Sequence, residues 1–170
     1  MSDKNDCRCS ECGRITEKKR IFQIDGDNIC ARCLYGDAEP FEIYPIGIVR
    51  NNLNRSRTGF GTSGPQGESR IELFPSQERF LYKIEDEKSL TVVYFLNKRK
   101  PVKSVFHRGL DGKKTGVFAT RTPDRLSGIA IQDVRLIRVE GTTLCVEGLD
   151  AIDKTPVLDI KMCWSNIADK

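Results

Sequence analysis

The sequence predicts a mostly β protein, with a small β-barrel that follows a small cysteine-rich module of the zinc-ribbon type. Three observations carry this prediction. Seven short segments rich in Val, Ile, Phe and Thr follow one another, several of them bounded by Gly or Pro. One short segment has helical spacing, and five of the seven cysteines fall between Cys7 and Cys33. Many short strands with one helix favour a barrel over an alternating α/β sheet.

The chain divides into two expected modules. Its 170 residues suit one domain of ordinary size plus a small appendage. Residues 1–38 form the cysteine module, residues 37–40 a short polar hinge, and residues 41–170 the β domain. The predicted strands of the β domain are Ile43–Arg50, Glu68–Phe74, Leu90–Leu96, Gly116–Thr120, Ile129–Val139, Thr142–Glu147 and Val157–Met162.

Two local signals connect these strands. Glu140-Gly141 lies between two apolar runs and predicts a hairpin turn. A short helix is expected after Pro75-Ser76, where Ser76 would cap a turn that places Phe80, Leu81 and Ile84 at helical spacing.

Composition argues against secretion and membrane insertion. Apolar residues make up 38% and charged residues 31%, which is normal for a soluble globular protein. No apolar run approaches the roughly 20 residues of a membrane helix. Residues 1–6 are polar and lack the apolar centre of a signal peptide. We therefore expect a cytoplasmic protein with no membrane partner.

The cysteine spacing is the most specific local motif. Cys9 and Cys12 are separated by two residues, as are Cys30 and Cys33, and 17 residues separate Cys12 from Cys30. Two such knuckles supply a tetrahedral four-thiolate shell, which favours structural Zn²⁺ over an iron–sulfur cluster or free thiols. Cys7 could compete with Cys9 for the ion. Ribbons of this kind contact nucleic acid or protein, and the motif does not choose between them.

The positive charge is concentrated in one stretch. Residues 1–40 have a net charge of −1, and residues 41–170 have +5. The stretch from Lys98 to Arg125 alone has +7, because it holds nine Lys or Arg residues and two Asp residues. Such a stretch would attract nucleic-acid phosphates.

Three segments of the β domain are candidates for a site, each with a plain structural alternative. Residues 51–67 form a Gly-rich polar loop with several arginines, which is either a flexible connection or a loop that closes over a ligand. Thr115–Arg125 ends an apolar run on two arginines, whose planar forks suit carboxylate or phosphate. Residues 148–161 concentrate aspartates and lysines, which would either stabilise turns or build the site.

Other reactive residues are assigned packing or surface roles. Cys145 and Cys163 lie in or at the end of apolar strands, which indicates packing more than nucleophilic chemistry. His107 is the one histidine and lies in the basic stretch, where a solvated loop position is at least as well supported as a catalytic one.

The two longest motifs resemble a known family. The residues from Gly116 to Arg121, followed by those from Asp150 to Lys161, closely resemble the TsaA-like (TrmO-type) family. Its known members are tRNA N6-methyltransferases that use S-adenosylmethionine on threonylcarbamoyladenosine beside the anticodon. The resemblance includes the segments 44–50, 65–67 and 84–95 and covers about residues 42–164. It implies a small closed β-barrel that forms a homodimer and binds the cofactor near the subunit interface.

The resemblance also implies roles for single residues. Arg121 would hold the methionine carboxylate, and the basic stretch would attract tRNA or another RNA. Arg125, Asp159 and Lys161 are candidates for catalysis, although the base remains unassigned. The other residues implied at the cofactor are Pro65, Gln66, Gly67, Leu149, Asp150, Ala151 and Ile152.

Three positions depart from the family pattern. The family continues its arginine motif as Arg-Pro-Asn-Pro-Ile-Gly, whereas this chain has Arg125 to Ala130 with Ser-Gly in place of the rigid turn. A Phe-His pair is replaced by Leu96-Asn97, and Lys-Pro-Tyr by Lys161-Met162-Cys163. These changes suggest a different substrate or weakened catalysis.

Three functions are consistent with the sequence. The first is a methyltransferase that acts on tRNA or another adenosine-containing RNA, with the ribbon helping it to dock. The second is a binding module that keeps the cofactor or RNA surface without transferring methyl groups. The third is a methyltransferase with a non-RNA substrate. The departures favour the second function, and Arg121, Arg125 and the aspartate motif favour the first.

Overall fold

A computed structural model describes residues 6–54, 67–98, 101–109 and 111–164. The chain forms two compact units that do not follow one another along the sequence. One unit, which we call the barrel unit, comprises residues 43–97 and 128–170. The other, which we call the ribbon unit, combines residues 1–42 with residues 98–127. The module boundaries expected from the sequence, 1–38 and 41–170, stay a prediction.

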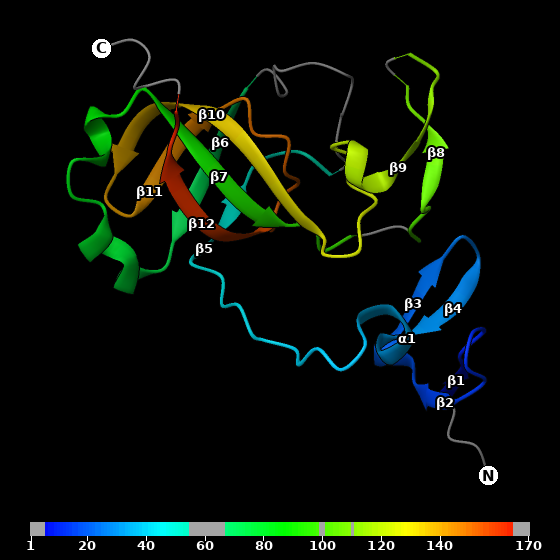
Figure 1. Cartoon of the computed structure of the whole chain (residues 1–170). Coiled ribbons are helices and arrows are strands. Elements are labelled where there is room, and N and C mark those ends of the chain that lie inside the picture. The colour runs from blue at the N-terminus through cyan, green and yellow to red at the C-terminus, as the bar shows by residue number, and fades with distance from the viewer. Residues whose placement is uncertain (1–5, 55–66, 99–100, 110, 165–170) are drawn as a thin grey trace. The chain divides into compact units, whose positions relative to one another are not determined.

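The barrel unit is a closed barrel of six antiparallel strands, which confirms the predicted fold class (Figure 1). Around the barrel the strands follow the order β10-β11-β6-β5-β12-β7. Their bounds are β5 Gly47–Arg50, β6 Glu68–Leu73, β7 Ser89–Phe95, β10 Ile129–Glu140, β11 Thr143–Glu147 and β12 Pro156–Met162.

The barrel interior is built from alternate residues of these strands. In β7 every second side chain is buried, because successive residues of a strand point to opposite faces. The residues that form the continuous core are Val49, Ile71, Leu73, Leu90, Val92, Tyr94, Val134, Leu144, Val146, Leu149, Ala151 and Val157. Burial of this apolar set is the main stabilising contribution to the barrel.

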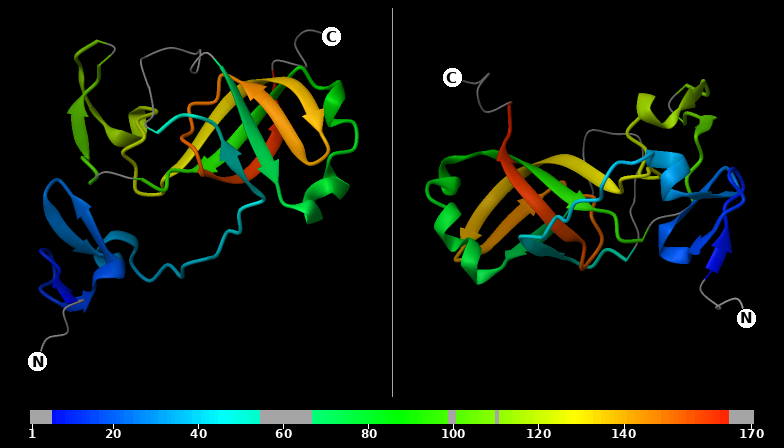
Figure 2. Two further views of the ribbon diagram at one scale, coloured as in Figure 1. Left: turned by 180° about the vertical axis from the view of Figure 1, so that it is seen from behind. Right: turned by 60° about the horizontal axis from the view of Figure 1, so that its bottom comes forward.

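Two irregularities bend the longest strands. The register of β10 against β11 shifts between Leu136 and Arg138, and that of β12 against β7 shifts between Val157 and Asp159. Such bulges increase local twist and curvature, which a barrel of short strands needs in order to close. Both views in Figure 2 show β10 curving around the barrel.

Two expected elements are wrong in detail. The expected helix after Pro75-Ser76 is a 3₁₀ helix, η2 (Pro75–Phe80), followed by a 3₁₀ turn, η3 (Ile84–Asp86); the N-cap of η2 is Phe74. The expected strand Gly116–Thr120 is a two-part element instead, in which β9 (Lys114–Gly116) leads into the 3₁₀ turn η4 (Val117–Ala119).

The turn between β10 and β11 is confirmed. Glu140 pairs with Thr143, and Gly141 between them has a φ of +59°. A positive φ is accessible to glycine without steric cost, and this accounts for the hairpin that the sequence predicted.

The ribbon unit contains short hairpins and one short helix. Strands β1 (Asp6–Arg8) and β2 (Ile15–Glu17) pair, as do β3 (Ile21–Ile24) and β4 (Asp27–Cys30). A 3₁₀ turn, η1 (Lys18–Arg20), separates the two hairpins, and helix α1 (Ala31–Tyr35) follows β4. The third hairpin pairs β8 (Val105–His107) with β9. Within the described residues, no helix is both long enough and apolar enough to cross a membrane.

Candidate metal centre and barrel-end site

Four cysteine sulfurs meet in the ribbon unit, and they are the four that the spacing predicted. The sulfurs of Cys9, Cys12, Cys30 and Cys33 all lie within 4.8 Å of one another. Cys9 Sγ lies 3.9 Å from Cys33 Sγ, and Cys12 Sγ lies 3.8 Å from Cys30 Sγ. A tetrahedral ion with Zn–S bonds of about 2.3 Å separates its sulfurs by about 3.8 Å, so this donor set fits Zn²⁺.

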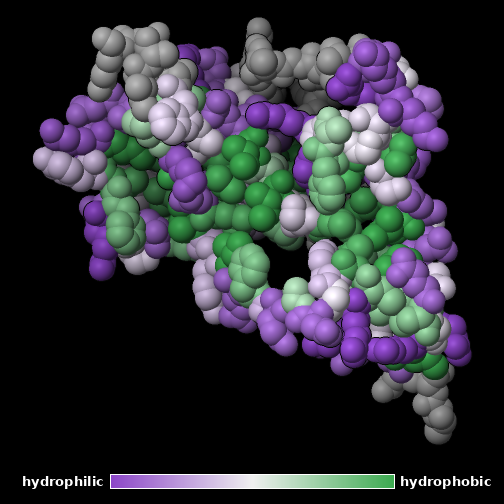
Figure 3. Space-filling view, in the orientation of Figure 1, coloured by the Kyte–Doolittle hydropathy of each residue, from purple (hydrophilic) through white to green (hydrophobic). Residues whose placement is uncertain are grey.

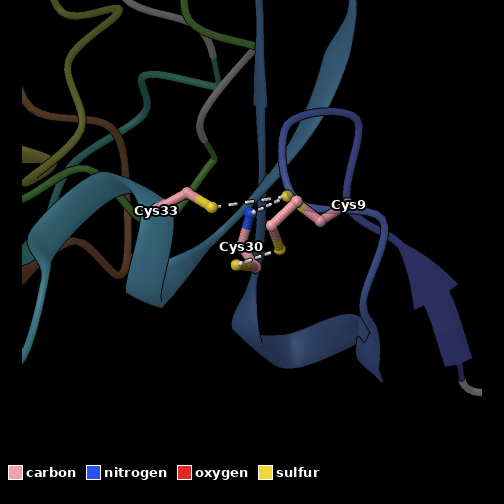
Figure 4. A group of neighbouring side chains, drawn as sticks. Cys9, Cys30 and Cys33 are labelled. Carbon is pink, nitrogen blue, oxygen red and sulfur yellow. Dashed lines mark hydrogen bonds between the residues drawn. The ribbon is translucent and has the colours of Figure 1, made fainter.

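Each half of the centre is placed by a tight turn (Figure 4). The first turn is closed by a hydrogen bond of 3.0 Å from Gly13 N to Cys9 O, with Gly13 at a φ of +69°. The second pair begins where β4 ends at Cys30 and continues into α1, which contributes Cys33. Cys30 N donates to Cys9 Sγ at 3.3 Å and joins the two halves.

Electrostatics of the four thiols favour a bound cation. Backbone N–H groups of Cys12 and Cys30 stabilise the Cys9 thiolate and lower the pKa of Cys9 to about 6. The sulfurs of Cys12 and Cys30 have the opposite effect on Cys33 and raise its pKa well above the ordinary value. Four thiolates therefore coexist here only beside a positive ion. Cys7 lies in β1 and is not part of the four-sulfur group.

The second candidate site lies at one end of the barrel, which we call the barrel end. It comprises residues 51–54, which follow β5, and residues 148–155, which connect β11 to β12. Asn51 joins the two segments, because its Nδ2 donates to Ala151 O at 2.8 Å and to Ser69 Oγ at 3.0 Å. Asp153 N donates to Leu53 O at 2.9 Å, which adds a backbone contact between the segments.

Gln132 fixes the beginning of the second segment from β10. Its Nε2 donates to Gly148 O at 2.6 Å, and its Oε1 accepts from Asp150 N at 2.8 Å. Tyr94 OH also lies 3.4 Å from Gln132 Oε1. Burial, with a smaller contribution from the negative charge of Asp150, raises the pKa of Tyr94 to about 12, so this phenol stays protonated.

The four residues expected to border the cofactor alternate in exposure. Leu149 and Ala151 are buried in the barrel core, whereas Asp150 and Ile152 are half-buried. Packing of the Leu149 and Ala151 side chains in the core therefore anchors the segment 148–155. Asp150 and Ile152 keep part of their surface accessible to a ligand. A carboxylate beside an apolar side chain suits the hydroxyls and the base of a nucleoside.

Asn97, which replaces the histidine of the resembling family, also serves the barrel end. Its Nδ2 lies 3.4 Å from Lys154 O. Leu96 N donates to Gly128 O at 2.8 Å, so the residues that precede and follow the segment 98–127 are joined. Two of the three departures from the family pattern, at 96–97 and at 126–128, lie at this junction.

The two arginines of the expected site belong to the ribbon unit. Arg121 is exposed. Arg125 is half-buried, and its guanidinium donates to three backbone carbonyls: to Thr122 O at 3.1 Å, to Val117 O at 3.2 Å and to Thr120 O. Arg125 thus holds the turn that precedes it.

Asp159 and Lys161 are brought together on β12. They form an ion pair of 2.5 Å, with 47% and 63% of their side-chain surfaces exposed. Of the expected cofactor loop, Gly67 is described and exposed, at a φ of +129°, whereas Pro65 and Gln66 lie outside the described residues.

Asn51 and Gln132 were missed by sequence reasoning, although each has a local signal. Asn51 directly follows the apolar run that ends at Arg50, and Gln132 interrupts an apolar strand. Their hydrogen-bond partners are remote in sequence, so the sequence pattern could not predict these contacts. Cys145 and Cys163 are buried, in agreement with packing roles, and His107 is exposed in β8 with Nδ1 3.0 Å from Gly112 O.

Comparison with known proteins shows the family to which the chain belongs. The sequence model of the tRNA-methyltransferase O N-terminal domain matches residues 60–169. A probable S-adenosyl-L-methionine-binding protein of Archaeoglobus fulgidus is 41% identical over 127 residues, which are 74% of this chain and 35% of that protein. The mouse tRNA (adenine(37)-N6)-methyltransferase is 36% identical over 95 residues, covering 54% of this chain and 22% of the relative.

A solved structure has a similar fold. The crystal structure of TrmO from Pseudomonas aeruginosa has a TM-score of 0.61 and 27% identity, and the match covers 79% of this chain and 59% of that one. The chain thus spans 35% of the length of the Archaeoglobus protein and 59% of that of the Pseudomonas structure.

The fold and the barrel end define a class, closed six-stranded β-barrel proteins with a loop motif held at one end of the barrel. Within that class the chain belongs to the tRNA-methyltransferase O N-terminal domain family.

Proposed function

We propose that this chain is an S-adenosylmethionine-dependent methyltransferase that acts on N6 of an adenine in tRNA. The observation that carries the proposal is the family motif at residues 149–152, which Asn51 and Gln132 hold in place at the barrel end. Family membership supports the reaction class. The named activity of the mouse relative, which the chain matches over 95 residues, supports tRNA adenine N6 as the acceptor.

The chain's own residues would bind and orient the two reactants. Bound S-adenosylmethionine supplies an activated methyl group. Asp150 offers a carboxylate to ribose hydroxyls, Ile152 offers apolar surface to the base, and Arg121 is assigned to the methionine carboxylate by the family resemblance. Transfer to a nitrogen needs in-line positioning above all, which a segment fixed by side-chain amides favours.

A second candidate is a binding module of the same fold that transfers no methyl group. Asn97 favours it, because an amide that contacts Lys154 O cannot take a proton as a histidine would. The Archaeoglobus relative bears a name that states cofactor binding alone.

Calorimetric titration of the zinc-loaded protein with S-adenosylmethionine, followed by methyl transfer to an unmethylated tRNA pool, separates these candidates. Saturable binding at one per subunit with transfer to adenine N6 is the expected result. Binding without transfer to tRNA would favour the binding module, or a non-RNA substrate if another acceptor is methylated. Absence of binding at millimolar cofactor would contradict both.

The four-cysteine centre is proposed to hold structural Zn²⁺. The ion would bind Cys9, Cys12, Cys30 and Cys33 and neutralise part of their charge, and it would have no open position for substrate because the shell is filled by protein sulfurs. The geometry supports zinc through its sulfur separations of 3.8 and 3.9 Å. Metal analysis of the purified protein should find one zinc per chain and no acid-labile sulfide.

A homodimer and a cytoplasmic location are proposed as well. Large apolar side chains stand exposed on the barrel unit, among them Phe80 at 71%, Tyr82 at 85% and Ile131 at 58% exposure, and they offer surface for self-association. Light scattering after size exclusion should give about twice the chain mass of 19.2 kDa. The location rests on the clustered cysteines, since a reduced four-thiol centre suits a reducing compartment.

A further inference from the structure

The segment 98–127, which we call the excursion, leaves the barrel unit after β7 and returns to it at β10. It is fastened to the cysteine ribbon by the tip of the β3–β4 hairpin. Ile24 and Val102 form a parallel bridge, Val102 N donates to Gln23 O at 3.0 Å, and Asp25 N donates to Val102 O at 2.9 Å. Val102 of the excursion thereby pairs with the β3–β4 hairpin, whose strand β4 ends at Cys30.

Asp25 reinforces this attachment with its side chain. Its Oδ1 accepts from Ser104 N at 2.9 Å, and its Oδ2 accepts from Ser104 Oγ at 2.5 Å. These two donors, with a smaller contribution from the Lys103 charge, lower the pKa of Asp25. Asp25 also has a φ of +53°, a conformation that Asp and Asn tolerate better than most residues. The carboxylate is therefore both a turn residue and a clamp on the excursion.

The excursion concentrates positive charge on an attached surface. The described residues of the excursion hold seven basic and two acidic side chains, a net charge of +5, whereas the twelve basic and thirteen acidic residues in the sequence of the barrel unit give −1. Lys103, Lys113 and Lys114 are exposed, and Figure 3 shows hydrophilic residues gathered at the β8–β9 hairpin. Arg108 is paired with Asp111, and Lys113 Nζ lies 3.9 Å from the same carboxylate while 78% of its side-chain surface is exposed. Arg121 is a further exposed cation of the excursion.

An exposed aromatic ring lies on the same segment. Phe118 is 81% exposed, although its neighbour Val117 is buried. The guanidinium of Arg125 donates to the carbonyls of Val117 and Thr120 on either side of Phe118, so the turn that presents the ring is fixed. Cationic side chains together with a rigidly presented aromatic ring suit a nucleic-acid strand, whose phosphates bind the lysines and whose unstacked bases stack on the ring.

We propose that the excursion is a docking surface for the RNA phosphate backbone and that the four-cysteine ribbon holds this surface in shape through Asp25. The proposal rests on the proposed function and adds to it where the RNA is gripped and what the ribbon does. The metal centre then contributes to RNA affinity without contacting substrate.

The docking surface is tested by fluorescence anisotropy with a labelled tRNA pool at several salt concentrations. Lys113→Ala/Lys114→Ala removes two charges from the excursion, and Lys83→Ala/Lys88→Ala removes two exposed charges from the barrel unit. We expect the first variant to weaken binding by about tenfold and to lower the log–log salt slope by about 1–2, with the second close to wild type. Equal losses in both variants would show a general charge effect and overturn the docking surface.

The aromatic part has its own variant. Phe118→Leu keeps apolar volume and removes the stacking face, so it should weaken binding to a single-stranded oligonucleotide of the anticodon loop without changing the salt slope. Unchanged affinity would restrict the surface to phosphate contacts and contradict the proposed stacking.

The ribbon's role is tested at Asp25 with variants that both accept a positive φ. Asp25→Gly removes the side-chain clamp, whereas Asp25→Asn retains an acceptor for Ser104. In hydrogen exchange of zinc-loaded protein, Asp25→Gly should deprotect residues 102–107 and 114–117 and leave β7 protected, and Asp25→Asn should resemble wild type. The tRNA affinity should fall with the loss of protection. If residues 102–107 stay protected in Asp25→Gly and after zinc chelation, the ribbon does not support the excursion.

These outcomes are separable from failure of the proposed function. Cofactor binding, measured by calorimetry, reports on the barrel end. If the protein binds the cofactor but the excursion variant and the barrel variant lose the same tRNA affinity, the docking surface is overturned and the proposed function is not.

Discussion

At the scale of single residues, the barrel end depends on two amides that reach across the chain. Asn51 donates hydrogen bonds to Ser69 and Ala151, which lie 18 and 100 positions away in the sequence. Gln132 donates to Gly148 O and accepts from Asp150 N. An amide can donate and accept at once, so one side chain satisfies two backbone groups of opposite type. Position in the barrel, rather than residue type, gives these two side chains their role.

Gln132→Leu is expected to loosen the segment that follows β11. The substitution leaves Gly148 O and Asp150 N without their partner, which costs about 1–3 kcal/mol of unfolding free energy, and it should raise the Kd for S-adenosylmethionine. Urea melts and calorimetry measure the two effects. Asp133→Ala is the control, since Asp133 is exposed and its carboxylate accepts from Thr91 Oγ1 on the outer face. Equal cofactor affinity in Gln132→Leu would contradict a role of this segment in binding.

Arg121→Ala is expected to weaken cofactor binding by about tenfold or more, because a charge-assisted bond from a guanidinium to a carboxylate is lost. Calorimetric titration measures the Kd. Arg79→Ala removes an exposed arginine of η2 and should leave the Kd unchanged. An Arg121→Ala protein that binds S-adenosylmethionine like wild type would contradict the proposed role of Arg121 in cofactor binding.

At the scale of elements, the short strand β5 is held between two neighbours by close backbone approach. A Cβ on Gly47 would lie 2.5 Å from Glu72 O and 2.8 Å from Leu73 Cα, both backbone atoms of β6 or its end. Glycine at this position is therefore required by the spacing of β5 and β6.

Gly47→Ala should destabilise the barrel by about 1–3 kcal/mol, since the added methyl group pushes β5 away from β6. Thermal unfolding followed by far-UV circular dichroism is the measurement. Gly116→Ala is the matched control, because its Cβ would meet Ser104 O at an ordinary 3.8 Å. A melting temperature for Gly47→Ala that equals that of Gly116→Ala would show that the strands adjust without cost.

Ion pairs between β10 and β6 and within β10 are expected to make barrel stability pH-dependent. Arg138 contacts both Glu68 and Glu140, and its hydrogen bond lowers the pKa of Glu68 below the ordinary 4.5. A lowered folded-state pKa stabilises the fold above the ordinary pKa, and this contribution disappears as the pH falls through the folded-state value.

Arg138→Gln should therefore lower the melting temperature at pH 7 and have little effect near pH 3. Differential scanning fluorimetry across this range gives both values. Arg79→Gln, at an exposed position in η2, serves as the control. An equal loss at pH 7 and pH 3 would indicate that Arg138 stabilises by packing and not by charge.

At the scale of the whole molecule, the chain alternates between its two units. It begins in the ribbon unit, enters the barrel, leaves it at 98–127 to rejoin the ribbon, and then completes the barrel. The motif from Gly116 to Arg121 thus belongs to the ribbon unit, and the motif from Asp150 to Lys161 belongs to the barrel unit. A single family pattern spans two folding units.

Cys30→Ser should release zinc and leave the barrel folded, because Cys30 lies in the ribbon unit and the barrel has its own core. Metal analysis should fall from one zinc per chain to a small fraction, with the barrel melting within a few degrees of wild type. Cys145→Ser, in the buried β11, should retain zinc. Global unfolding on loss of the metal would mean that the two units share a core.

Local chemistry allowed the sequence alone to determine the strands, the Cys₄ motif and the family. Runs rich in Val, Ile, Phe and Thr mark β5, β6, β7, β10, β11 and β12, because such side chains suit the half-buried surface of a sheet. Thiol spacing predicts a metal shell, because a tight turn needs two residues between ligands. The strand expected at Gly116–Thr120 was wrong, because Val117–Ala119 form a 3₁₀ turn in which the apolar side chain of Val117 is buried.

The tertiary structure alone decided which segments meet. Asn51 with Ala151, Gln132 with Gly148, and Asp25 with Ser104 are contacts between residues 16 to 100 positions apart, and no periodicity encodes them. The excursion joins the ribbon for the same reason, because Ile24 and Val102, which pair, lie 78 positions apart in the sequence. Sequence patterns report local burial and ligand spacing, whereas long-range hydrogen bonds arise only once the chain is folded.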